Sequence, residues 1–183
     1  MKRRQRQAVL AAVDQQLAAE GSWCGETHLQ KAVYFLQTLL DVPTDFDYIL
    51  YKFGPFSREL RAELATMRAD GFLELVPRPQ PYGPTLDVTP SAQQQLVARW
   101  PKTLKRYASG LDFVAQQLGH LGVSDLERLA TALWVRRELP DASRDVQALR
   151  LNEIKPHVSL TDAADALAEV EGMEAEADQL IPA

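Results

Sequence analysis

Apolar residues near the start of the chain recur at three- and four-residue spacing, which is typical of helices that bury one face. A first helix is predicted over 5–19, with a stripe of Val9, Leu10, Val13 and Leu17. A second is expected to begin at Thr27, whose hydroxyl could cap it, with a buried face of Leu29, Ala32, Val33, Leu36, Leu39 and Leu40. Gly21 and Gly25 favour a turn between the two helices.

The spacing of the apolar residues then shortens from three or four residues to two. Residues 46–53 alternate and are rich in aromatic and branched side chains, so they predict a strand that ends at Gly54 and Pro55. A third helix is expected over 57–69, followed by Gly71 at the position of a C-terminal glycine. Its inward residues are Leu60, Leu64 and Met67.

Two further short segments that read as strands, 72–76 and 85–89, flank the proline-rich stretch 77–84. Proline cannot continue a helix, so these segments predict a β-hairpin with a stiffened tip. Two helices, a strand, a third helix and a hairpin follow the order of a winged helix.

Helical patterns fill the rest of the chain. Helices are expected over 90–118 with a break at Pro101, over 124–138 with a cap at Ser124, over 144–154 and over 161–172. The predicted fold class is therefore α+β, mostly α. Residues 1–100 form a winged-helix-like N-terminal domain with a β-hairpin wing, residues 101–173 form a helical C-terminal region packed on it, and residues 174–183 form a frayed acidic tail.

Charge is divided unevenly between the two parts of the chain. The net charge is −5, made up of +3 over residues 1–106 and −8 over residues 107–183. Because a phosphate backbone is repelled by acidic surface, any nucleic-acid binding belongs to the first part. The single cysteine and the lack of an apolar run of about twenty residues favour a cytoplasmic protein that does not enter a membrane.

Catalytic signatures are sparse. The sequence contains no glycine-rich phosphate or dinucleotide loop. Cys24 and His28, four residues apart, could form a thiolate pair, but a small buried cysteine is the favoured interpretation. A zinc site from Cys24, His28, His120 and His157 has only one close pair of ligands. We therefore expect no enzyme activity, no catalytic residues, no cofactor and no metal.

Aromatic residues gather around the Gly-Pro turn. They are Tyr48, Tyr51, Phe53 and Phe56. Packing of the second helix on the third would account for them, but any that point outward offer the rigid area that anchors protein interfaces. The expected protein-binding surface consists of Tyr51, Phe53, Phe56, Arg58 and Arg61.

The third helix also carries arginines outside its apolar stripe. In a winged helix it could enter the major groove, with the hairpin on the phosphate backbone. The alternative DNA-binding residues are Arg58, Arg61, Arg68 and Arg78, with the arginines of residues 3–6 as further phosphate contacts. Glu59, Glu63 and Asp70 share the helix, and such interleaved charges are typical of a solvated face with local ion pairs.

Several motifs resemble known bacterial families. They are Leu29-Gln30-Lys31 with Tyr34-Phe35-Leu36-Gln37, then Tyr51-Lys52-Phe53-Gly54-Pro55-Phe56-Ser57, then Gly71, and Lys155-Pro156-His157-Val158-Ser159. Over roughly residues 25–160 the chain is similar to YwgA-like proteins and, more distantly, to the Panacea domain of SocA-type antitoxins. The resemblance implies a protein that neutralises a toxin by direct contact, in toxin–antitoxin or phage-defence settings, and brings no catalytic residues.

The sequence thus favours a non-enzymatic bacterial binding protein, an antitoxin-like or regulatory protein-interaction module whose partner is a toxin or regulatory protein. The alternative is a winged-helix DNA-binding transcriptional regulator. A third expectation is a homodimer joined through the acidic C-terminal helices.

Overall fold

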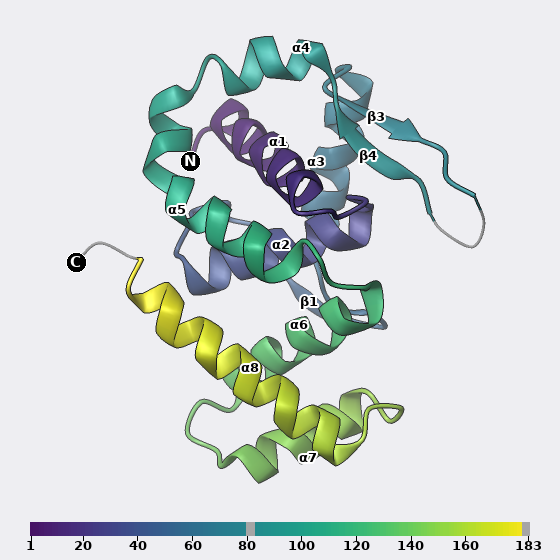
Figure 1. Cartoon of the computed structure of the whole chain (residues 1–183), viewed down its shortest axis with the longest axis vertical. Helices are drawn as coiled ribbons and strands as arrows, with labels where there is room; N and C mark the ends of the chain where they lie inside the picture. The colour runs from purple at the N-terminus through teal and green to yellow at the C-terminus, as the bar shows by residue number, and fades with distance from the viewer. Residues whose placement is uncertain (80–82, 181–183) are drawn as a thin grey trace.

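Helices dominate the chain, with two short antiparallel hairpins among them (Figure 1). The computed structural model describes residues 1–79 and 83–180. The first elements are α1 (Arg3–Ala19), α2 (Glu26–Leu39), β1 (Ile49–Tyr51), β2 (Gly54–Phe56), α3 (Arg58–Ala69), β3 (Leu73–Val76) and β4 (Thr85–Val88). They are followed by α4 (Pro90–Ala92), the π-helix η1 (Gln93–Val97), α5 (Pro101–Leu118), α6 (Val123–Glu138), α7 (Arg144–Ile154) and α8 (Leu160–Asp178). The predicted class, α+β and mostly α, is confirmed.

Helix α3 has the ends that its sequence predicts. The Ser57 hydroxyl accepts a hydrogen bond from the Leu60 backbone N–H at 3.1 Å, which satisfies one of the free donors of the first turn. At the other end Gly71 has φ of +72°, a conformation that glycine adopts without the steric cost of a side chain. Serine hydroxyls also cap α7 and α8, through Ser143 and Ser159.

Two further helix boundaries differ in how well the sequence predicted them. The expected break at Pro101 is confirmed, because η1 ends before Trp100 and α5 begins at Pro101. The expected cap at Ser124 is wrong, since α6 begins at Val123 with Gly122 in the capping position. Glycine can adopt the backbone conformation of a cap although it has no side-chain oxygen. The Ser-x-x-Glu pattern therefore predicted the cap of this helix two residues too late.

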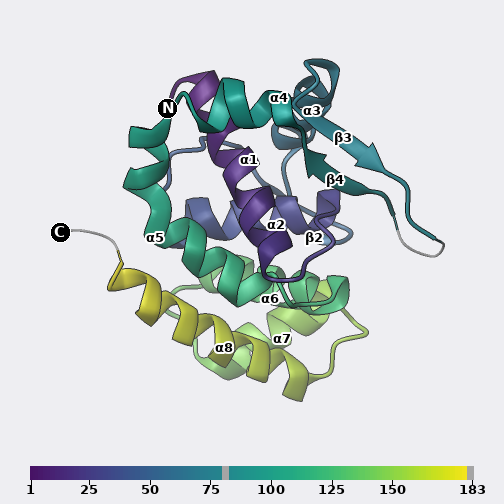
Figure 2. The ribbon, with the colours of Figure 1, turned by 45° about the horizontal axis from the view of Figure 1, so that its top comes forward.

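The hairpin β3–β4 forms as predicted, with Leu73 opposite Val88 and Val76 opposite Thr85. Figures 1 and 2 both show it projecting from the helical body. Strand β4 is attached to the loop after α1, because the Leu86 N–H donates to the Cys24 carbonyl at 2.9 Å. The predicted proline-rich tip, 77–84, includes residues 80–82, which lie outside the described residues.

The segment before α3 is not the single strand that alternation predicts. Regular pairing covers only Ile49–Tyr51, and Gly54–Phe56 turns back to pair with it as β2, so the Gly-Pro step lies within a second hairpin. Proline is tolerated there because a two-stranded sheet leaves one side of each strand free of pairing. The two hairpins form separate sheets.

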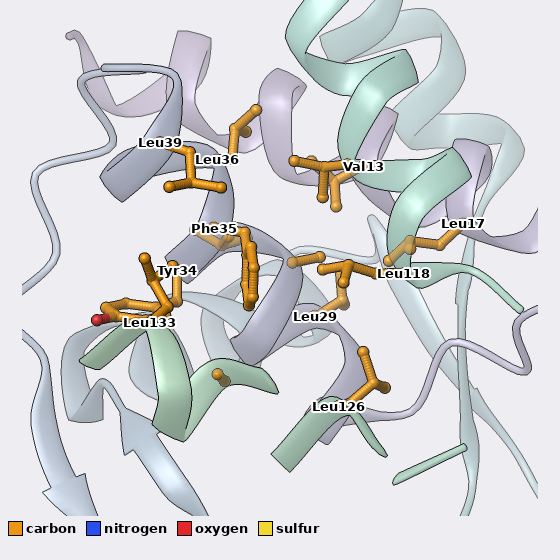
Figure 3. Close-up of a cluster of buried hydrophobic side chains, with 14 of the residues drawn as sticks. Val13, Leu17, Leu29, Tyr34, Phe35, Leu36, Leu39, Leu118, Leu126 and Leu133 are labelled. Carbon is orange, nitrogen blue, oxygen red and sulfur yellow. The ribbon is translucent and has the colours of Figure 1, made fainter. Parts of the chain in front are cut away.

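Helix α2 lies at the centre of the core. It packs against α1 and α5 on one side and α6 on the other, and α6 in turn carries α7 and α8. Figure 3 shows side chains of these helices meeting at α2: Val13, Leu17, Leu29, Tyr34, Phe35, Leu36, Leu39, Leu118, Leu126 and Leu133. All ten are buried, and full burial of one leucine contributes about 2 kcal/mol, so α6 joins the two halves of the chain through this core.

The acidic tail is more ordered than expected. Helix α8 continues through residues 174–178 instead of fraying there, and Ala177 is buried. Arg136 of α6 pairs with Glu174 at 2.6 Å. The prediction of a frayed tail from residue 174 is therefore wrong over this part, because buried apolar side chains recur at Val170, Met173 and Ala177 and ion pairing holds the same turns.

Candidate functional site

All five residues predicted to bind a protein line one cavity of about 470 Å³, which we call the hairpin groove. Its volume lies within the range of roughly 300–1,000 Å³ that is usual for ligand sites. The lining consists of Glu26, Thr27, Gln30, Lys31, Ile49, Tyr51, Phe53, Phe56, Arg58 and Arg61. Residues from α2, the β1–β2 hairpin and α3 therefore meet in one hollow.

The outer wall of the groove is apolar and exposed. Ile49, Tyr51 and Phe53 have 42%, 58% and 51% of their surface accessible, which is unusual for large apolar side chains. The Tyr51 and Phe56 rings lie 5.8 Å apart, so the wall extends toward α3. Tyr48 points the other way, into the core, with its ring 4.9 Å from that of Tyr34. Three of the four aromatic residues around the turn therefore face the groove.

Gly54 allows the hairpin to lie directly on α6. Its φ is +86°, and a Cβ atom at this position would be 2.9 Å from the Thr131 hydroxyl oxygen. Both the backbone conformation and the close approach therefore require glycine. The glycine thus fixes the height of the aromatic wall above the helical core.

Gln30 joins the floor of the groove to the start of α3. Its side-chain amide donates to the Ser57 carbonyl at 2.9 Å, and its carbonyl oxygen accepts from the Ser57 N–H at 3.0 Å. All of these atoms are buried, so each bond also avoids the cost of leaving a polar group unpaired. This pair of hydrogen bonds fixes the position of Ser57 and hence of Arg58, which follows it directly.

Two lysines hold the hairpin from beneath. The Lys31 ammonium donates to the Pro55 carbonyl at 2.8 Å, and the Lys155 ammonium donates to the Lys52 carbonyl at 3.0 Å. Glu127 of α6 lies 3.6 Å from the Lys155 nitrogen. Sequence reasoning did not identify this lysine cradle, because residues 31, 127 and 155 come together only in the folded chain.

Burial changes the chemistry of Lys31. Only 2% of its surface is accessible, and this loss of water lowers its pKa from 10.5 to about 8. The Glu127 charge acts against the decrease, and the nearby Lys155 charge adds to it. At neutral pH the ammonium form still prevails, so the floor of the groove is positively charged.

The arginines of α3 divide between the groove and a neighbouring hollow. Arg58 is exposed and has no ion pair with any residue that the structure describes. Arg61 pairs with Glu26 at 3.4 Å and lies 6.0 Å from the centre of the Phe56 ring. The pair stands between the groove and a second hollow of about 560 Å³, which both of its residues also line. Among these arginines of the groove, Arg58 is therefore the one whose charge no described carboxylate neutralises.

One of the two remaining residues of the DNA-binding set, Arg68, lines the second hollow. The guanidinium of the other, Arg78, lies 5.5 Å from the ring centre of Trp23, which belongs to the lining. Leu75 of β3 contributes an exposed apolar side chain to it. Arg58, Arg61 and Arg68 thus lie along α3, and Arg78 lies beyond the end of β3.

The arginines at the start of the chain have other partners. Arg3 donates to Glu63 at 3.1 Å, and Arg4 lies 3.4 Å from Asp70, so α1 neutralises two acids of α3. The Arg6 guanidinium lies 4.8 Å from the centre of the Phe46 ring. The predicted role of residues 3–6 as phosphate contacts is at odds with these intramolecular contacts.

The Cys24–His28 pair does not form a reactive thiolate. The Cys24 thiol is buried and donates to the Asp14 carbonyl at 3.1 Å, and burial together with the Asp14 charge raises its pKa to about 12. The His28 Nε2 atom bonds the Leu121 carbonyl at 3.0 Å, and burial lowers the pKa of its imidazole. Within residues 1–79 and 83–180, no three His, Cys, Asp or Glu side chains are grouped as metal ligands.

No helix in the described part of the chain has the length and hydropathy needed to span a bilayer. Comparison with protein-family models and with curated proteins finds no match to this chain.

Proposed function

We propose that this chain is a cytoplasmic protein-interaction module, antitoxin-like or regulatory, that binds its partner protein through the hairpin groove. One observation carries the proposal: five residues chosen for their aromatic or cationic chemistry line a single open cavity. Exposed aromatic and arginine side chains around a hollow are the features that most often dominate protein interfaces.

The residues that resemble YwgA-like and Panacea proteins support the same proposal. Lys31 and Gln30 belong to one motif and Pro55 and Ser57 to the other, and hydrogen bonds join the two motifs directly. Lys155 of the third motif bonds the same hairpin. These residues, which belong to the motifs that carry the resemblance, therefore line the groove or bond to its lining or its hairpin, as a binding surface common to these families would require.

The test is recovery of a partner from the native host with three forms of the chain. The groove variant is Tyr51→Ser with Phe53→Ser. The matched control is Val146→Ser with Leu149→Ser, which removes two comparably exposed apolar side chains, 49% and 51% accessible, from α7. We expect a stoichiometric partner with the wild type and the control but not with the groove variant. A partner that all three forms retain equally would contradict the proposal.

A winged-helix DNA-binding regulator is the second candidate. It is supported by Arg58 and Arg68, which lie on α3 outside its buried face and have no ion pair among the described residues, and by the hairpin that follows. Binding of duplex DNA at low salt should then weaken strongly when Arg58, Arg61 and Arg68 are replaced by alanine. Fluorescence anisotropy that shows no binding, or equal binding by the variant, would exclude this candidate.

A further inference from the structure

The hairpin groove carries an excess of positive charge. Its cations are Lys31, Arg58 and Arg61, and its one acid is Glu26. Because Glu26 pairs with Arg61, the positive charges of Lys31 and Arg58 remain. Glu63 of α3 and Asp70, which follows this helix, do not compensate for them, because they lie outside the lining of the groove and pair with residues of α1.

The ammonium of Lys31 has unused hydrogen-bonding capacity. Of its three N–H donors one meets the Pro55 carbonyl, and among residues 1–79 and 83–180 the other two have no acceptor. Glu127 attracts Lys31 from a distance but lies against Lys155, so one carboxylate serves two buried ammonium groups. A buried cation with free donors is costly unless an anion approaches it.

The surroundings of Lys31 restrict what that anion can be. Only 2% of the lysine is accessible, and it lines the same cavity as Tyr51 and Phe53, so a ligand group has to enter this cavity to reach it. A carboxylate on a flexible side chain can do so, whereas a duplex presents its phosphates on a wide, rigid surface. The aromatic wall also needs an apolar surface opposite it, which a peptide segment provides.

We propose that the groove binds an acidic segment of the partner protein, in which an Asp or Glu side chain lies against Lys31 and Arg58 while adjacent apolar side chains pack on Tyr51 and Phe53. This inference rests on the proposed function and adds to it the chemistry of the partner. A carboxylate between an ammonium and a guanidinium makes charge-assisted hydrogen bonds, which are the stronger class of such bonds.

The probe is a library of short random peptides displayed on phage without a free C-terminus, selected against the immobilised full chain. We expect the enriched peptides to carry Asp or Glu next to aromatic or branched apolar residues. Replacing that acid by its amide in a synthetic peptide should weaken binding to the wild type by about tenfold or more. The same replacement should have a smaller effect on the Arg58→Gln variant, because the cation it contacts is gone.

Two protein variants and a control complete the experiment. Lys31→Met should lose the preference for acidic peptides, and its circular dichroism shows whether it folds. Arg58→Gln decides the question if Lys31→Met does not fold, since Arg58 is exposed and unpaired within the described residues. Arg99→Gln, an exposed arginine outside the groove, should bind like the wild type.

The outcomes separate this inference from the function on which it rests. Enriched peptides that need Tyr51 and Phe53 but contain no acid would overturn the inference and leave a purely apolar binding groove. An acid whose amide replacement affects the wild type and Arg58→Gln equally would also overturn it. If no enriched peptide depends on Tyr51 and Phe53, the proposed function itself fails.

Discussion

Asp14 on α1 is a buried carboxyl group whose proton should control stability. Only 2% of its surface is accessible, and its Oδ1 atom has no hydrogen-bond partner among the described residues. Burial, and after it the charge of Asp87 on β4, raises its pKa from 3.8 to about 7, although the Cys24 thiol acts in the opposite direction. Asp14→Asn keeps the shape of the side chain and removes the charge.

The sign of the effect follows from proton binding. Between about pH 4 and pH 7 the unfolded chain has lost the Asp14 proton and the folded chain still holds it, so stability falls as pH rises. The interval from 3.8 to about 7 corresponds to about 4 kcal/mol, at 1.36 kcal/mol per pH unit. An unpaired amide in the variant costs about 1–3 kcal/mol at every pH. Asp14→Asn should therefore be no more stable than the wild type near pH 4 and about 1–3 kcal/mol more stable above pH 7.

Urea unfolding at a series of pH values from about 4 to about 8 measures this difference directly. The control is Asp165→Asn, which removes an exposed carboxylate from α8 and should leave the pH profile of the wild type in place. Because only the difference between the profiles enters this prediction, the absolute stability is not required. Parallel profiles for the wild type and Asp14→Asn would refute it.

Four other outcomes are expected. Gly54→Ala should lower the free energy of unfolding by about 2 kcal/mol or more, because its φ is +86° and the new Cβ meets Thr131. Gly71→Ala, with a positive φ but open space around it, should lower it by only about 1 kcal/mol. Equal losses would contradict the close approach of Gly54 to Thr131. Ser57→Ala should cost about 1 kcal/mol through the lost cap, and urea unfolding with no change would show that the hydroxyl does not stabilise α3. Cys24 should resist iodoacetamide in the native chain and react once urea unfolds it, so rapid native alkylation would disprove its buried, protonated state. Self-association through the acidic C-terminal helices stays a prediction, and light scattering at two concentrations decides it.

Local signals made several elements predictable. Helix α3 has an apolar stripe, a serine cap and a terminal glycine, and the structure places it at Arg58–Ala69 as expected. The β3–β4 hairpin was predictable because prolines separate two short strand-like segments. Each of these features depends on residues that are close in the sequence.

The β1–β2 hairpin and the lysine cradle were not predictable, for a different reason. The turn between β1 and β2 is Lys52-Phe53, which carries none of the usual turn residues, and its geometry depends on contact between Gly54 and α6. Lys31 lies among apolar neighbours on α2, where a lysine would ordinarily extend to solvent. The lining of the groove was predicted by its aromatic and cationic chemistry, but its floor depends on partners about a hundred residues away.

The dependence of β1–β2 on α6 and Lys155 limits how the binding surface can be transplanted. A fragment containing only residues 1–100 would retain Tyr51, Phe53 and Arg58 but would lack the Lys155 bond to the Lys52 carbonyl. It would also expose the face of α2 that α6 covers. Truncation should therefore abolish both partner binding and the cooperative thermal unfolding transition. Fusion proteins or inhibitors built on this surface consequently need the entire chain.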